Sequence, residues 1–132
     1  MKPKSVVTCV PSRELERSLV FYRECFGLPE LAIEEGMFVI ELGNLSLFVM
    51  SSESFQEYTD TIGLSAGVPQ ESLQVLHSCA IEDRAEMDRV FSTAEQFGGT
   101  VAKPIHTNKW GQEIGYIRDP DGHMWELVKV GD

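Results

Sequence analysis

Glu126 is the acidic residue with the clearest potential for chemistry in this sequence of 132 residues. It lies in an apolar run over residues 124–130, where strand alternation places its side chain on one face with Met124 and Val128. A carboxylate in such surroundings can act as a general base or orient a substrate. An ion pair with Arg118 or another cation is the alternative. Glu126 is therefore a candidate catalytic or ligand-orienting residue.

The three histidines differ in their surroundings. His77 lies in an apolar strand-like run, a pattern typical of a hydrogen-bonded histidine at the edge of a core, with metal ligation or acid–base chemistry as the alternative. His106 and His123 fall at a strand end and in a turn, so we expect both to be solvated, with His123 serving the turn.

The cysteines Cys9, Cys25 and Cys79 are odd in number and have no CxxC spacing. This argues against a zinc cluster and a disulfide framework, and it favours a reducing cytoplasm. No histidine is spaced to activate a thiolate, so we expect the cysteines to be structural.

The net charge of −10, from 11 basic and 21 acidic residues, repels nucleic-acid phosphates and anionic membranes. No apolar run approaches the roughly 20 residues that a membrane span requires. The charge would attract cationic ligands. Lys4, Lys103 and Lys109 are interpreted as ordinary surface charges.

Apolar periodicity predicts the elements that must position these side chains. In the first half, a strand ended by Pro11 leads to a helix capped by Ser12 and then to three further strands. Gly43-Asn44 predicts a hairpin turn between the last two strands. The four strands are expected at residues 6–10, 31–33, 37–42 and 45–50.

The same pattern then returns after a stretch rich in Ser, Thr, Gly and Gln, with one short helix near residues 55–58. Asp83 can cap a second helix, and the sequence Asp-Pro-Asp-Gly predicts the last hairpin turn. The fold class is therefore α+β, with two βαβββ repeats whose sheets meet around a trough. The divisions are repeat 1–50, linker or lid 51–74 and repeat 75–132, with second-half strands at 75–81, 100–105, 113–118 and 124–130.

Aromatic and apolar strand residues are candidates to line such a trough, although the core is the alternative for any one of them. Trp110 precedes a glycine in a loop, where it would either wall the pocket and stack on a planar ligand or plug the open end of the sheet. Arg118 would supply a positive charge if it points inward. The other candidates are Phe38, Phe48, Met50 and Tyr116.

Two motifs resemble the glyoxalase/bleomycin-resistance/extradiol-dioxygenase family, the vicinal-oxygen-chelate superfamily. The first is LERSLVFY at residues 15–22 with Phe-Gly-Leu behind it, and the second is Trp-Gly at 110–111 followed by IRDPDGHMWEL at 117–127. Together with the repeat, the resemblance covers essentially the whole chain. It implies two βαβββ modules forming a U-shaped sheet around a cavity, commonly in a homodimer.

The resemblance also implies a site for Zn, Ni, Mn or Fe(II) with ligands on four strands. Carried over one position at a time, these places hold Ser5, Leu47, Leu76 and Glu126. His77 is one residue from the third place and would reach the cavity only through a β-bulge. Since only Glu126 is a good ligand, we predict a site without metal or other cofactor, with a divalent metal as the alternative.

Two functions therefore stay open. The first is a metal-free cytoplasmic protein, similar in type to bleomycin-resistance proteins, that holds a small, partly apolar, cationic molecule in a trough completed by a second subunit. The second is an enzyme with Glu126 as its base or sole anchor, either a lyase or isomerase like glyoxalase or a dioxygenase. The acidic charge, Trp110 and the missing ligands favour binding.

Overall fold

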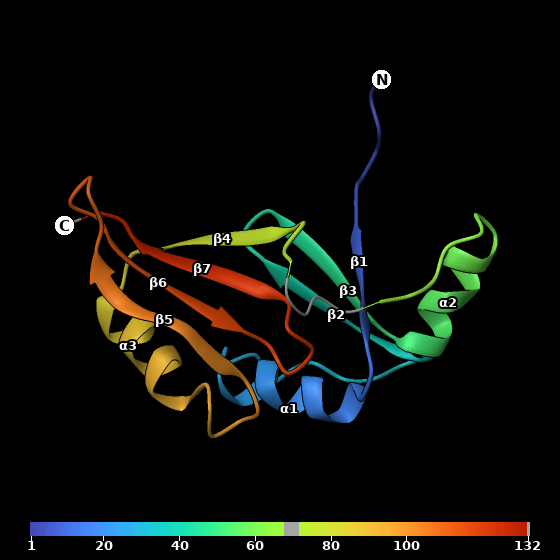
Figure 1. Ribbon diagram of the computed structural model, residues 1–132, viewed down its shortest axis with the longest axis horizontal. Helices are drawn as coiled ribbons and strands as arrows, with labels where there is room; N and C mark the ends of the chain where they lie inside the picture. Colours follow the sequence, from blue (N-terminus) through green and yellow to red (C-terminus); the bar gives the residue numbers. More distant parts are fainter. Residues whose placement is uncertain (68–71, 132) are drawn as a thin grey trace.

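The computed structural model describes residues 1–67 and 72–131 (Figure 1). Residues 68–71 of the predicted linker lie outside the described residues. The helices are α1 (Leu15–Glu24), α2 (Ser52–Asp60) and α3 (Arg84–Thr93). The strands are β1 (Thr8–Ser12), β2 (Met37–Leu42), β3 (Leu45–Ser51), β4 (Leu76–Ile81), β5 (Thr100–Thr107), β6 (Glu113–Arg118) and β7 (Met124–Lys129).

The strands form two sheets, ordered β1-β3-β2 and β4-β7-β6-β5. In each sheet the first strand of the module runs parallel to the last strand, while the hairpin pairs are antiparallel. Helices α1 and α3 lie on one side of the sheets, below them in Figure 1. The predicted α+β class and its two modules are confirmed. Within the described residues the two sheets share no paired strands, so each module contributes a sheet of its own to the predicted architecture.

The strand predicted at residues 31–33 is wrong, and it leaves β2 at the edge of its sheet. Only Glu34 pairs there, with Met37, around a two-residue turn in which Glu35 and Gly36 both have positive φ. The Leu31 carbonyl accepts a hydrogen bond from Arg23 Nε at 2.8 Å, and the Leu31 side chain is buried. Since this segment is anchored to α1, it does not extend along β2.

The ends of the first elements also differ from the prediction. Pro11 does not end β1 but lies inside it, paired with Met50. An edge strand tolerates a proline because the backbone on its outer side needs no N–H donor. Helix α1 begins at Leu15 after Glu14, and Ser12 is buried in β1 instead of capping the helix. The predicted cap at Asp83 is confirmed, since its carboxylate accepts the Ala85 N–H at 2.9 Å.

The core lies between the helices and the faces of the sheets that point toward them. In β7, Trp125 and Leu127 are almost fully buried on this side, and in β3 Leu47 and Val49 are buried likewise. Because strand side chains alternate, Glu126 and Phe48 point to the opposite side. That side, called here the open face, has none of the three described helices over the second sheet (Figure 1).

In the part of the chain that the structure describes, no helix is long and apolar enough to cross a membrane.

Candidate functional site

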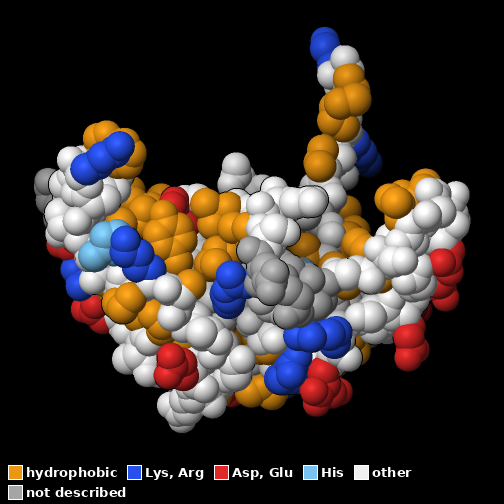
Figure 2. All heavy atoms as spheres, viewed as in Figure 1, with side chains coloured by type: hydrophobic (Ala, Val, Ile, Leu, Met, Phe, Trp, Pro, Cys, Tyr) orange, Lys and Arg blue, Asp and Glu red, His pale blue; other side chains and the backbone are white. Residues whose placement is uncertain are grey.

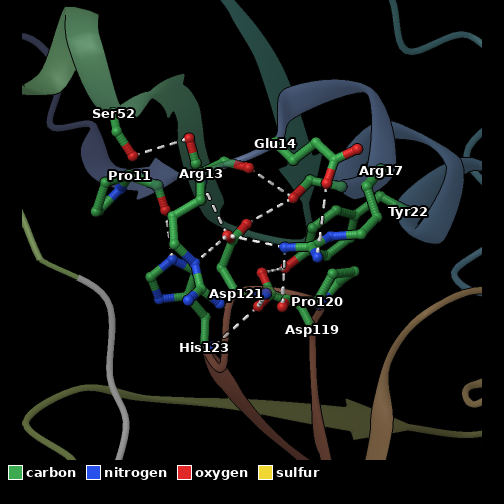
Figure 3. A network of polar contacts seen from close by, with 12 residues as sticks. Pro11, Arg13, Glu14, Arg17, Tyr22, Ser52, Asp119, Pro120, Asp121 and His123 are labelled. Carbon is green, nitrogen blue, oxygen red and sulfur yellow. Dashed lines mark hydrogen bonds and ion pairs between the residues drawn. The ribbon is translucent and has the colours of Figure 1, made fainter.

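The Asp-Pro-Asp-Gly turn lies in a buried polar cluster that joins the two modules (Figure 3). The Asp121 carboxylate accepts the Ser18 hydroxyl at 2.7 Å and the Arg13 backbone N–H at 2.9 Å. Arg17 Nη2 lies 3.5 Å from the same carboxylate. Burial alone would raise the pKa of Asp121, but hydrogen bonds from Ser12, Ser18 and the Arg13 N–H outweigh it and lower that pKa. The turn is thus tied to the start of α1.

A second carboxylate of the turn, Asp119, connects it to the last turn of α1. Tyr22 donates its hydroxyl to Asp119 at 2.7 Å, and the Trp125 indole N–H donates to the Tyr22 oxygen at 3.1 Å. Burial raises the pKa of both Asp119 and Tyr22, and their proximity raises that of Tyr22 further. Both sequence motifs therefore meet in one buried network, here called the motif cluster: Ser18, Tyr22, Asp119, Asp121 and His123.

His123 was expected to be solvated, and this is wrong. Its side chain is buried, and Nε2 lies 2.8 Å from the carbonyl oxygen of Pro11, which accepts the bond (Figure 3). The turn holds the histidine over β1 because Asp119 accepts its backbone N–H at 2.9 Å. His123 therefore serves the turn, as predicted, and also links it to the first module.

His77 lies on the helix side of β4 and not with Glu126. The β4–β7 pairing runs without a bulge and sets Ser78 opposite Glu126, so His77 points to the other face. Its ring packs on Trp125 with 4.6 Å between centroids, and burial lowers its pKa. His77 therefore lies at the edge of the core against Trp125 and not beside Glu126, and the hydrogen bond expected for its ring is not found among the described residues.

Glu126 lies on the open face in a row of polar side chains that crosses the second sheet. Ser78 donates its hydroxyl to one carboxylate oxygen and Tyr116 donates to the other, each at 2.6 Å. The bond to Glu126, followed by burial, raises the pKa of Tyr116, so the phenol stays protonated at neutral pH. Lys103 of β5 pairs with Tyr116 and completes what we call the polar row: Ser78, Glu126, Tyr116 and Lys103.

Apolar residues flank the polar row on the same face. Leu76 and Met124 lie on one side of it, and Val128 and Ile114 lie on the other, as strand register requires. Figure 2 shows this upper surface hollowed between the β5–β6 tip and α2, with apolar side chains over β4 and β7. A fixed carboxylate bordered by apolar side chains can hold a cationic group attached to a hydrocarbon body.

The donors needed for a metal centre are not gathered around Glu126. Ser5 precedes β1 and is exposed, whereas Leu47 faces the core with an exposure of 1%. Placing Leu47 beside the cavity was therefore wrong; Phe48 faces that side of β3. Leu76 does lie on the open face, but its side chain is a hydrocarbon. In the described residues no group of three or more His, Cys, Asp or Glu could hold an ion. These positions do not fit a divalent metal.

The remaining predicted site residues separate into three groups. Phe38 belongs to the core and Met50 is buried with 5% exposure, so neither lines the open face of the second sheet. Trp110 is 74% exposed at the β5–β6 tip, where Lys109 Nζ lies 4.6 Å from its ring, so it does not plug the sheet. Arg118 lies on the open face and, contrary to the ion-pair interpretation, does not bind Glu126, whose described partners are hydroxyls.

Sequence reasoning did not assign a site role to Ser78 or Lys103. Ser78 could have been found from strand pairing. The first strand pairs with the last strand in both modules, and this pairing sets Ser78 opposite Glu126. Lys103 was interpreted as an ordinary surface charge, and only the irregular pairing of β5 brings it into register with Tyr116. Pro104, which follows Lys103, is the sequence signal for an irregularity here, since a proline inside a strand is confined to edges and bulges.

A separate depression of about 810 Å³ lies along β2, where the predicted strand is missing. Its lining includes four glutamates together with Leu31 and Met37. These carboxylates are exposed and make no ion pair in the described part of the chain. We place the candidate site at the polar row, where hydrogen bonds fix the functional group.

The chain is similar to a known protein family in sequence and to solved proteins in structure. The profile of the Glyoxalase/Bleomycin resistance protein/Dioxygenase superfamily matches residues 5–127. No curated protein matches the sequence significantly. The hypothetical protein SA1046 from S. aureus shares 19% identity with a TM-score of 0.81, over 98% of this chain and 96% of that one.

Two further solved structures carry functional names. The lactoylglutathione lyase from Agrobacterium tumefaciens is 22% identical with a TM-score of 0.64, over 97% of this chain and 95% of that one. The fosfomycin resistance protein FosX from Mesorhizobium loti is 18% identical with a TM-score of 0.67, over 99% and 95%. At these identities the likeness is one of fold. The profile match, which spans nearly the whole sequence, shows that the chain belongs to the Glyoxalase/Bleomycin resistance protein/Dioxygenase superfamily.

Proposed function

We propose that this protein binds a small, partly apolar, cationic molecule at Glu126 on the open face of the second sheet, without a metal ion. The observation that carries the proposal is the carboxylate held by Ser78 and Tyr116 at 2.6 Å each. These bonds fix both oxygens in one orientation before any ligand arrives, which lowers the entropy that binding must lose.

The chemistry of the ligand follows from what the carboxylate still accepts. An ionised carboxylate has about four acceptor positions, and the two hydroxyls use two of them. A ligand must therefore present N–H or O–H donors, and a charged amine gains most from the contact. The flanking Leu76 and Met124 favour an apolar body, and the net charge of −10 attracts cations to the surface.

A second copy of the chain is proposed to complete the trough. The first strands of both modules, β1 and β4, are edge strands, and in the described residues each is paired on one side only. Large apolar side chains are exposed close to both edges, and such exposure is typical of an interaction surface. They are Val6 and Val7 before β1, and Leu73, Val75 and Leu76 at β4. We propose a cytoplasmic homodimer.

The alternative function is a glyoxalase-like lyase or isomerase, or a dioxygenase, with Glu126 in a divalent-metal site. The contact between Glu126 and Tyr116 favours chemistry in one respect, because it pairs a carboxylate base with a phenol that stays protonated. Stabilisation of an enolate would also need an electrophile. The hydrocarbon side chains at Phe48 and Leu76 offer none. Arg118 and Lys103 are cations on the same face, but the hydrogen bonds and ion pairs of the described residues bring neither to Glu126. Binding is therefore the better-supported function.

Metal analysis of the purified protein, combined with thermal denaturation, tests the proposal. After EDTA treatment, benzylamine is expected to raise Tm in the wild type and in Glu95→Gln, a control at an exposed glutamate in the turn after α3, but not in Glu126→Gln. Ni, Zn, Mn and Fe(II) are expected to leave Tm unchanged. Stoichiometric metal in the wild type that is lost in Glu126→Ala would instead establish the metal-dependent alternative.

A further inference from the structure

The strand β5 carries two irregularities that turn basic side chains onto the open face. Val101 pairs with Ile117, which faces the core, yet Lys103 pairs with Tyr116, which faces the opposite way. Two residues of regular strand would keep Lys103 on the side of Val101, so the register shift between them reverses its direction. A second shift sets His106 opposite Ile114 on the open face.

Arg118 adds a positive charge on the same face. It lies two residues after Tyr116 on β6, so the two side chains share a face about 7 Å apart along the strand. Within residues 1–67 and 72–131, ion pairs to carboxylates involve Arg13, Arg17 and Arg84. Neither Arg118 nor Lys103 is among them, although the chain has an excess of acidic residues.

Positive and negative groups are therefore separated across the sheet. Glu126 on β7 is held by hydroxyls, and Lys103 lies two strands away, roughly 10 Å between backbones. Long basic side chains shorten that gap, and Tyr116 lies between the two charges. Within the described residues, these two basic groups have no carboxylate partner, and the carboxylate beside them has no basic partner. Such a surface is complementary to a dipolar molecule.

We infer that the ligand is a zwitterion, with an amine that binds Glu126 and an anionic group that binds Lys103 and Arg118. This inference rests on the proposed function and narrows its ligand to a short aminoalkyl carboxylate or a molecule of the same charge pattern. The anionic end confers selectivity, because a simple amine leaves both basic groups without a partner. The apolar rows beside Tyr116 contact the carbon spacer.

Calorimetric titration of the EDTA-treated protein with three probes of equal length tests this inference. The probes are 5-aminopentanoate, which carries both charges, pentylamine, which carries the positive one, and pentanoate, which carries the negative one. We expect 5-aminopentanoate to bind the wild type at least tenfold more tightly than either other probe. The Lys103→Gln/Arg118→Gln protein should bind it no better than pentylamine, and its affinity for pentylamine should stay within about twofold of wild type.

The control is Lys129→Gln, which removes a lysine from the same sheet but from the side of Leu127, and it should bind all probes as the wild type does. Pentylamine binding as tightly as 5-aminopentanoate, with no effect of the double substitution, would overturn the zwitterion inference and leave the proposed function intact. Pentylamine binding equally well to Glu126→Gln would overturn the proposed function. Binding of none of the probes to folded wild type would contradict both.

Discussion

The motif cluster and the polar row use similar chemistry in opposite ways. In both, a tyrosine and a serine donate hydroxyl hydrogen bonds to carboxylates: Tyr22 and Ser18 in the cluster, Tyr116 and Ser78 in the row. The cluster is buried between the modules, whereas the row faces outward. Most residues of the two family motifs therefore hold the fold together, and Glu126 is the motif residue on which the proposed ligand site depends.

The largest effect is expected where the cluster is broken at Asp121. Asp121→Ala leaves the Ser18 hydroxyl and the Arg13 N–H without their acceptor in a buried place, which should lower the free energy of unfolding by about 3 kcal/mol. Urea denaturation followed by circular dichroism measures it. Asp88→Ala, which removes an exposed pair with Arg84, is the matched control and should cost less than about 0.5 kcal/mol. Equal losses would show that the cluster does not join the modules.

The motif cluster and the polar row can also be compared through their tyrosines, by the effect of each on the free energy of unfolding and its dependence on pH. Tyr22→Phe should lower the free energy of unfolding by about 1–2 kcal/mol at pH 7, and Tyr116→Phe by less. The pKa of Tyr22 is raised in the folded protein, so the fold holds that proton more tightly than the unfolded chain does. Its stabilising contribution is therefore complete below about pH 10 and decreases as the pH rises beyond that value.

Urea denaturation of both variants between pH 8 and 11 measures this dependence. Tyr22→Phe should flatten the alkaline loss of stability relative to the wild type. An alkaline profile that is unchanged in Tyr22→Phe would contradict the burial of this phenol against Asp119.

Substitution in the polar row should separate binding from stability. Glu126→Gln keeps the shape of the side chain and loses its charge, so the free energy of unfolding should change by less than about 1 kcal/mol. Affinity for benzylamine should fall at least tenfold, because the ion contact is lost. Calorimetry and urea denaturation on the same preparation check both. A loss of several kcal/mol in stability would assign Glu126 to the structural group instead.

The smallest effect is expected at Trp110. Its side chain is 74% exposed at the β5–β6 tip, so Trp110→Ala should change the free energy of unfolding by less than about 0.5 kcal/mol. If Trp110 stacks on aromatic ligands, the variant should bind benzylamine more weakly than the wild type and 5-aminopentanoate equally well. Equal weakening for both probes would show that stacking is not its role.

The sequence carried enough information for most of the fold because periodicity and turn residues act locally. Asp83 caps its helix and Gly43-Asn44 turns its hairpin as their chemistry requires. The strand at residues 31–33 failed because a tertiary contact decided it: Arg23 of α1 holds the Leu31 carbonyl away from β2.

The site was harder to predict, since it depends on the face of the sheet to which each side chain points. The repeat suggested Leu47 as the counterpart of Glu126, but the β2–β3 turn has two residues, whereas residues 119–123 separate β6 from β7. Aligning Gly43 with Gly122 therefore does not align side chains that point to the same face of their sheets. Leu47 points into the core. In β5, Pro104 signals an irregular strand, but the pairing with β6 decides which side chains the register shifts turn outward.

The central claim is that ligands bind at the polar row without metal, and amide chemical shifts mapped by NMR test it most directly. On adding benzylamine to the EDTA-treated, isotope-labelled protein, we predict saturable shifts centred on Ser78, Tyr116 and Glu126. Shifts confined to the acidic depression along β2, around Glu34 and Glu41, would contradict that claim, as would shifts at the row that occur only after a divalent metal is added.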